Sequence, residues 1–148
     1  MKLAALAAVL AGSIALPPAA FSSDLDEAVT QPEKKLRQYA AFFTAPQMKC
    51  EQWADSVTPL GYEKPKDLIE GKELFAVLAK VWDDTLAAGE NPKARAFREL
   101  TRLFTSDIEA SLRFRERQGR PDGETTEQLH ARRLKLCRDT QELGARLE

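Results

Sequence analysis

Apolar side chains recur every three or four residues through most of the chain, and no stretch keeps alternating apolar and polar positions over a strand length. This spacing puts the apolar residues on one face of a helix and is the main sequence signal for amphipathic α-helices. The pattern predicts long helices over about 30–43, 66–88, 91–118 and 126–146, and a short helix from Thr44 through Met48, Cys50 and Trp53. We therefore expect an all-α fold.

Four stretches resemble helix starts. "TQPE" from Thr30 and "TAPQ" from Thr44 place a capping threonine before a proline, and Asn91 stands directly before another proline. A small polar residue caps a helix, and proline is tolerated in its first turn. A further capping pattern, "SDIE" from Ser106, would allow a break near Thr105, but the apolar stripe keeps its phase there. We therefore predict one long fourth helix.

Short polar connections between the predicted helices favour an antiparallel bundle of four main helices plus one short helix. The residues expected in its core are Leu36, Tyr39, Ala40, Phe43, Leu68, Phe75, Leu78, Trp82, Leu86, Phe97, Leu100, Phe104, Ile108, Leu112, Leu129, Leu136, Leu143 and Leu147.

The first residues have the plan of a secretory signal: Lys2, an apolar run over 3–16, and prolines followed by small residues. The run is shorter than the roughly 20 apolar residues that cross a bilayer. Cleavage after Ala20 or Ser22 fits, and the small residues of "AFS" favour Ser22. We predict a signal peptide over 1–22, a single helical domain over 23–148, no membrane span, and a periplasmic or secreted product.

The two cysteines, Cys50 and Cys137, lie far apart in a chain predicted to enter an oxidising compartment, where disulfides persist. A structural zinc site usually takes four Cys or His ligands, and the chain has two cysteines and one histidine. We expect a disulfide that ties the fold, with two free thiols or an intermolecular link as the alternatives.

The sequence gives little support for catalysis. His130 and Cys137 are two helical turns, about 10 Å, apart on the last helix, too far for direct proton transfer. His130 has no evident acid to orient it, and Asp83 and Asp84 point about 100° apart on a helix, where Lys80 is the better partner for Asp84. Nucleotide-binding, hydrolase and zinc-protease motifs are absent. We expect no enzyme.

A haem or small-ligand bundle is the alternative function. Covalent haem attachment needs C-x-x-C-H, which the sequence lacks. Met48 and His130 are the residues that could supply a noncovalent ligand pair, but a core methionine and a surface histidine are the better explanation, because no supporting motif is present. We predict no cofactor and no metal.

Charge is nearly balanced overall but unevenly spread, with eight basic and four acidic residues over 91–120. This excess is too mild for a usual nucleic-acid binder. Placing Phe97 at 0° on a helical wheel gathers five arginines between about 100° and 200°. They are Arg95, Arg98, Arg102, Arg113 and Arg117, called the basic ridge below. The ridge is either a solvated face with local ion pairs or a surface that meets an acidic partner.

Leu60 and Tyr62, in the predicted loop "PLGY", either cap the bundle or contact a partner. "KCEQW" resembles the cysteine-glutamate start of small periplasmic acid-stress chaperones of the HdeA type, which are exported, all-helical and closed by one disulfide; this chain is longer and its cysteines are further apart. We expect a non-catalytic protein that binds another envelope protein, as an inhibitor, an immunity factor or a chaperone. The oligomeric state is left open.

Overall fold

The computed structural model describes residues 18–57, 65–117 and 123–147, and each regular element in these ranges is an α-helix. The helices are α2 (Pro18–Thr30), α3 (Pro32–Thr44), α4 (Cys50–Val57), α5 (Pro65–Ala87), α6 (Pro92–Arg117) and α7 (Thr126–Arg146). The predicted all-α class is confirmed. Among the described helices, none is both long and apolar enough to cross a membrane.

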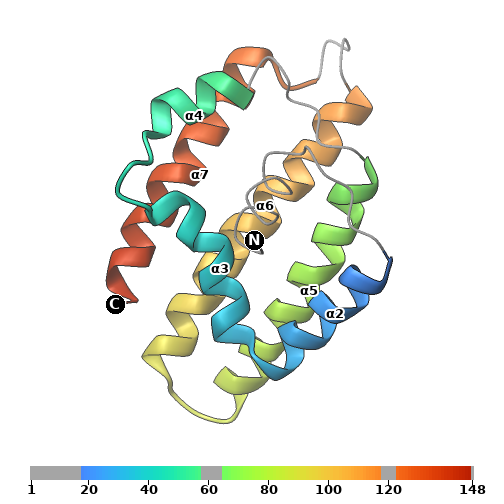
Figure 1. The fold of residues 1–148 in the computed structure, drawn as a ribbon, viewed down its shortest axis with the longest axis vertical. Helices are drawn as coiled ribbons and strands as arrows, with labels where there is room; N and C mark the ends of the chain where they lie inside the picture. Colours follow the sequence, from blue (N-terminus) through green and yellow to red (C-terminus); the bar gives the residue numbers. More distant parts are fainter. Residues whose placement is uncertain (1–17, 58–64, 118–122, 148) are drawn as a thin grey trace.

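The longest helices, α5 and α6, pack side by side and are joined by a tight turn at Gly89 (Figure 1). Gly89 has φ 154°, which residues with a side chain rarely adopt, so glycine suits the end of α5. α7 packs against both α6 and α3, while α2 packs against α5 and α3. The short helix α4 packs mainly on α7.

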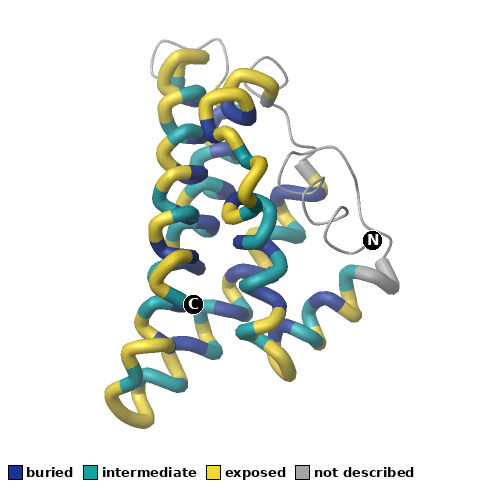
Figure 2. Tube along the Cα trace, turned by 60° about the vertical axis from the view of Figure 1, so that its left-hand side comes forward, coloured by how far each residue is buried: buried dark blue, intermediate teal, exposed yellow. Residues whose placement is uncertain are grey.

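Aromatic side chains from α3, α5 and α6 fill the interior. Tyr39, Phe43, Phe75 and Phe104 form a series of ring contacts with centroids 5.1 to 6.3 Å apart, a range in which ring pairs are favourable. Figure 2 shows buried positions recurring along each helix, with exposed positions between them. Leu86, Leu112 and Leu147 are partly buried and pack against the core, and the other residues that the sequence predicts for the core are buried, because the apolar period matches the helical period.

Two predicted features of α6 are confirmed. Asn91 Oδ1 accepts a hydrogen bond from the Ala94 backbone N–H at 3.0 Å, and Pro92 occupies the first turn. The helix continues unbroken past Ser106 to Arg117. The phase of the apolar stripe therefore outweighs the local capping pattern at Ser106.

The start of α7 also follows the sequence. Thr125 Oγ1 accepts from the Gln128 backbone N–H at 3.1 Å, and the Gln128 side chain accepts from the Thr125 N–H at 2.8 Å. This capping box satisfies two backbone donors that a helix start otherwise leaves free.

The predicted helix start at Thr44 is wrong. Thr44 is the last residue of α3, and the chain leaves the helix at Ala45, which is extended with φ −59° and ψ 138°. Pro46 explains the break, because a residue before proline is disfavoured in the α region. The short helix consequently begins at Cys50.

The predicted start at Thr30 is wrong as well, because 18–30 forms a helix that the sequence analysis did not predict. Thr30 ends α2, and its hydroxyl donates to the Asp26 carbonyl at 2.9 Å. Ala28 is buried, and Phe21 and Leu25 pack against the core at helical spacing. The carboxylate of Asp24 also turns inward, which interrupts the apolar pattern and hides the helix in the sequence.

Cys50 and Cys137 form the predicted disulfide, with their Cα atoms 5.6 Å apart, inside the usual range. α4 has eight residues, too few for a helix that is stable in isolation. Two contacts to α7 support it beside the disulfide: an ion pair of Glu51 with Arg138 at 3.1 Å and a hydrogen bond between His130 and Asp55 at 2.6 Å.

Candidate functional site

The basic ridge lies along α6 as predicted, but the structure divides it into two parts. Its first three arginines are each paired with a carboxylate: Arg95 with Glu90, Arg98 Nε with Asp83 Oδ1 at 2.7 Å, and Arg102 with both oxygens of Glu99. The bond to Glu99 raises the pKa of Arg102. Surface pairs of this kind add little stability, and they largely neutralise this part of the ridge.

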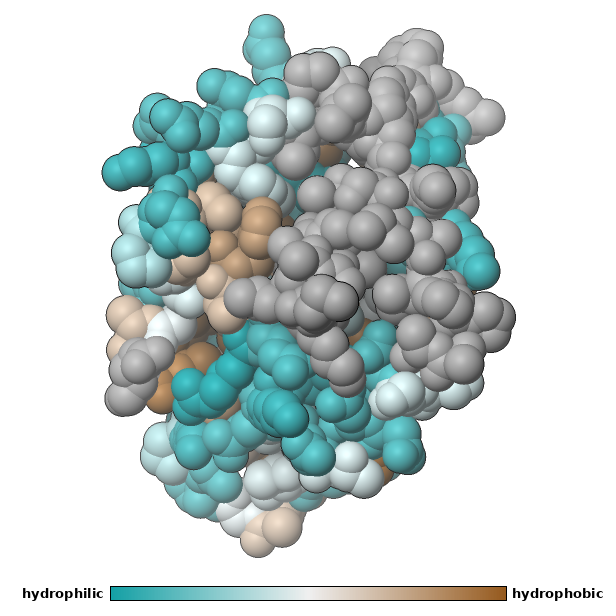
Figure 3. Space-filling view, viewed as in Figure 1, coloured by the Kyte–Doolittle hydropathy of each residue, from teal (hydrophilic) through white to brown (hydrophobic). Residues whose placement is uncertain are grey.

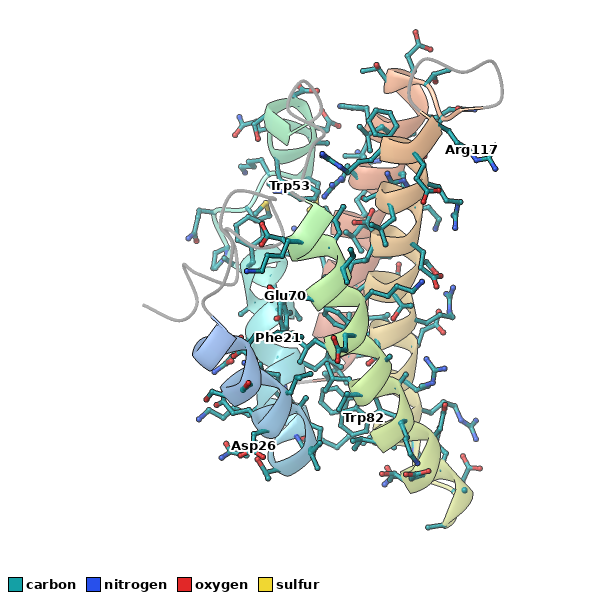
Figure 4. The ribbon with its side chains drawn as sticks, turned by 90° about the vertical axis from the view of Figure 1, so that its right-hand side faces the viewer. Phe21, Asp26, Trp53, Glu70, Trp82 and Arg117 are labelled. Atoms are coloured by element: carbon teal, nitrogen blue, oxygen red, sulfur yellow. A yellow bond between two sulfur atoms is a disulfide. The ribbon has the colours of Figure 1, made fainter. Side chains whose placement is uncertain are left out.

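The other two arginines, Arg113 and Arg117, lie in the last two turns of α6. Arg113 is exposed and, among the residues that the structure describes, forms no ion pair. Figure 4 shows Arg117 at the end of α6, projecting away from the other helices. The guanidinium of Arg113, which has no carboxylate partner among the described residues, is available to an anionic group of another molecule.

A groove runs between α6 and α7 next to the ridge, and we call it the α6–α7 groove. Its central hollow has a volume of about 200 Å³ and is lined by Arg102, Leu103, Ser106, Asp107, Arg132, Lys135, Leu136 and Asp139. A second, more polar hollow follows toward the connection between the helices, lined by Ala110, Arg113, Phe114, Arg117, Gly123, Glu124 and Gln128. The linings contain five cations (Arg102, Arg113, Arg117, Arg132 and Lys135) against three carboxylates (Asp107, Glu124 and Asp139).

Arg132 is the central charged residue of this groove. Its guanidinium donates to both oxygens of Glu124 at 3.0 Å, to Asp107, and to Ser111 Oγ at 3.3 Å. Burial lowers the pKa of Arg132, but the bonds to Glu124 and Asp107 outweigh it and raise the pKa overall. The bidentate geometry fixes the guanidinium between the two helices.

Asp107 is the buried acid of the groove, with 11% of its side chain exposed. Burial raises the pKa of Asp107 to about 6, although Arg132 opposes this shift. Arg133 lies behind it, with one guanidinium nitrogen 3.7 Å from Asp107 Oδ2 and its carbon 5.8 Å from the Trp53 ring centre. Burial lowers the pKa of Arg133 to about 10.

The α7 wall of the groove was not predicted from the sequence. Arg132, Lys135 and Asp139 are spaced three and four residues apart and share one face of α7. The sequence contains this signal in "RRLKLCRD", next to His130 and Cys137. Which neighbouring helix that face meets cannot be read from the period alone.

His130 lies at the contact between α4 and α7. Its Nε2 donates to Asp55 Oδ1 at 2.6 Å, so the expectation that no acid orients this histidine is wrong. Asp55 is 75 residues away in the chain, which is why sequence spacing did not reveal it. Within the described residues, the pair links α4 to α7 beside the disulfide.

Met48 and Phe42 are partly buried and pack against the core. Figure 3 shows apolar side chains gathered between α3 and α4 on this face of the molecule. Leu60 and Tyr62, which were predicted to cap the bundle or contact a partner, lie outside the described residues.

The two neighbouring aspartates of α5 have different partners. Lys80 pairs with Asp84 at 2.9 Å, as its spacing predicts, while Asp83 pairs with Arg98.

A second buried charge cluster lies between α2 and α3. Lys35 is 1% exposed, and its Nζ donates to Asp24 at 2.5 Å and to Glu27 at 3.1 Å. An ammonium group without such partners would be costly to bury. The cluster therefore fixes α2 on α3 and is a feature of the fold.

In the described parts of the chain, no three His, Cys, Asp or Glu side chains are grouped so that they could hold a metal ion. No protein-family model, no curated protein and no solved structure matches this chain.

Proposed function

We propose that this chain is an exported, non-catalytic helical protein that binds another protein of the cell envelope, as an inhibitor, an immunity factor or a chaperone. Export rests on the signal-like sequence over 1–22, of which 1–17 lie outside the described residues. The Cys50–Cys137 disulfide is compatible with an oxidising compartment.

The observation that carries the binding function is the exposed Arg113, which has no ion-pair partner in the described residues and lines a groove with more cations than carboxylates. Arginine's planar fork suits directed contacts to carboxylates. The excess of two positive charges is small for a surface that would follow a nucleic-acid backbone, where many phosphates are neutralised. An acidic protein surface is the better match.

The architecture that we propose as the scaffold is an antiparallel bundle of α3, α5, α6 and α7, formed within a single domain over 23–148. α6 packs on α5 and α7, and α7 packs on α3, so each of the four helices has a neighbour in the set. α4 is the short helix tied to this set by the disulfide, and α2 is an additional helix.

Affinity capture from an envelope extract tests the binding function. Charge reversal in R113E/R117E is expected to lower capture of the partner at least tenfold, and added salt is expected to weaken capture by the wild type. Arg113 is a better target than Arg98 or Arg102, because reversing either of those two also breaks its pair with Asp83 or Glu99.

The matched control is K34E/K66E, which changes net charge by the same amount at two exposed positions on α3 and α5. This control is expected to capture the partner as the wild type does. Equal capture by R113E/R117E and the wild type would contradict a role for the α6–α7 groove.

A further inference from the structure

The central hollow of the α6–α7 groove is lined by both apolar and charged side chains. Leu103 and Leu136 are its large apolar side chains, and its volume is about 200 Å³. A cavity of roughly 150 Å³ accepts a benzene-sized group. The hollow therefore has room for one large apolar side chain.

Arginines lie on both sides of this hollow along α6. Arg102 pairs with Glu99, and both side chains are about half exposed, so the pair is weak and another carboxylate can replace Glu99. Arg113, on the other side, has no carboxylate to displace within the described residues. Two carboxylates of a ligand can thus be bound without opening the buried contacts of Arg132.

The groove does not suit a bound helix. A helix docks with a stripe of apolar anchors at i, i+3, i+4 and i+7, but Asp107 and Arg132 line the central hollow beside its leucines, and Glu124 lines the second hollow. These charged groups would face the apolar stripe of the helix. An extended segment that offers a single apolar side chain avoids this conflict.

Resting on the proposed function, we propose that the α6–α7 groove seats an extended acidic segment of the partner protein, with one apolar side chain in the hollow and carboxylates on Arg102 and Arg113. Ser106, at the rim of the hollow, is about 6 Å along the helix from Arg102 and about 10 Å from Arg113. An extended chain advances about 3.3 Å per residue. In the bound segment of the partner, the acidic residues therefore lie two positions before the apolar residue and about three positions after it.

The peptide Glu-Ser-Leu-Ser-Glu-Glu has this pattern and serves as the probe. Titrating it into isotope-labelled full chain without the signal segment is expected to shift amide signals around Leu103, Ser106, Arg113 and Leu136. Replacing its leucine by glycine is expected to weaken binding about tenfold, because the apolar contact is lost. Replacing its glutamates by lysine is expected to abolish binding.

Two variants of the protein locate the site. Ser106→Trp fills the hollow from an exposed position and is expected to abolish peptide binding, while Ala76→Trp, at an exposed position on α5, is expected to leave it unchanged. Any one of three results would overturn the proposal. They are peptide-induced shifts outside α6 and α7, an absence of shifts at millimolar peptide, and shifts that follow protein concentration, which would indicate that a second copy binds.

The same variants separate this proposal from the proposed function. Capture that is lost in R113E/R117E but retained in Ser106→Trp would mean that the protein binds its partner at the arginines and not through the hollow. Capture that survives R113E/R117E would instead overturn the function.

Discussion

At the residue scale, the strongest structural constraint is the buried ammonium of Lys35, which is held between Asp24 and Glu27. Removing one partner of a buried ion pair leaves a charge without compensation. Lys35→Met is therefore expected to lower the free energy of unfolding by about 3 kcal/mol, measured by urea denaturation. The double variant K35M/D24N removes the stranded carboxylate charge and is expected to recover about 1 kcal/mol of that loss. A fully stable K35M variant would refute the role of this cluster.

Asp107 makes the stability depend on pH. Burial raises its pKa to about 6 in the folded protein, above its ordinary value of about 3.9. The folded state therefore binds the Asp107 proton more tightly than the unfolded state does. The stability that this proton adds is present in acid and is lost as pH rises through about 6. From pH 5 to pH 7 we expect the unfolding free energy to fall by roughly 1 kcal/mol from this group.

Asp107→Asn is the matching variant, because asparagine has a similar shape and does not titrate in this range. Its unfolding free energy is expected to change less between pH 5 and pH 7 than that of the wild type. Glu99 does not interfere with this comparison. Its bond to Arg102 lowers its pKa, so the stability that Glu99 adds is lost only at a pH below the range from 5 to 7. An identical slope in D107N and the wild type would show that another group titrates.

At the element scale, α4 depends on its attachments to α7. Closing the loop between Cys50 and Cys137, 87 positions apart, stabilises the fold by up to about 4 to 5 kcal/mol in the chain-entropy model. In C50A/C137A, hydrogen exchange of the α4 amides is expected to speed up more than that of α5 and α6, because α4 is too short to persist alone. Uniformly faster exchange in all helices would show that α4 is not separately tied.

The element boundaries show what the apolar pattern could and could not predict. The cores of α5, α6 and α7 were predictable, because Phe75, Phe104 and Leu136 follow the helical period without interruption. The end of α3 was predicted to within one residue, but the start of the short helix was missed, because Pro46 keeps Ala45 out of the helix and the same proline also fits a helix start. The groove was only half predictable: the arginines of α6 share a face by spacing, but Asp107 and Arg132 come together through the packing of α7 on α6.

At the scale of the whole molecule, maturation affects how the fold begins. Cleavage after Ser22 would remove Phe21 and the first turns of α2 but keep Asp24, Glu27 and Ala28, which hold α2 in place. Amino-terminal sequencing of exported protein is expected to begin at Phe21 or Ser23. Mature protein that retains Met1 would contradict the predicted signal.

The central claim is that the α6–α7 groove is the surface that meets a partner protein. The most direct test is a photo-crosslinking amino acid placed singly at Lys135 and at Ala110, which line the groove, and, as a control, at the exposed Lys80 on α5, with irradiation of intact cells. The same crosslinked protein is expected from positions 135 and 110, and none from position 80. Adducts from position 80 alone, or an absence of adducts at both groove positions, would contradict this claim.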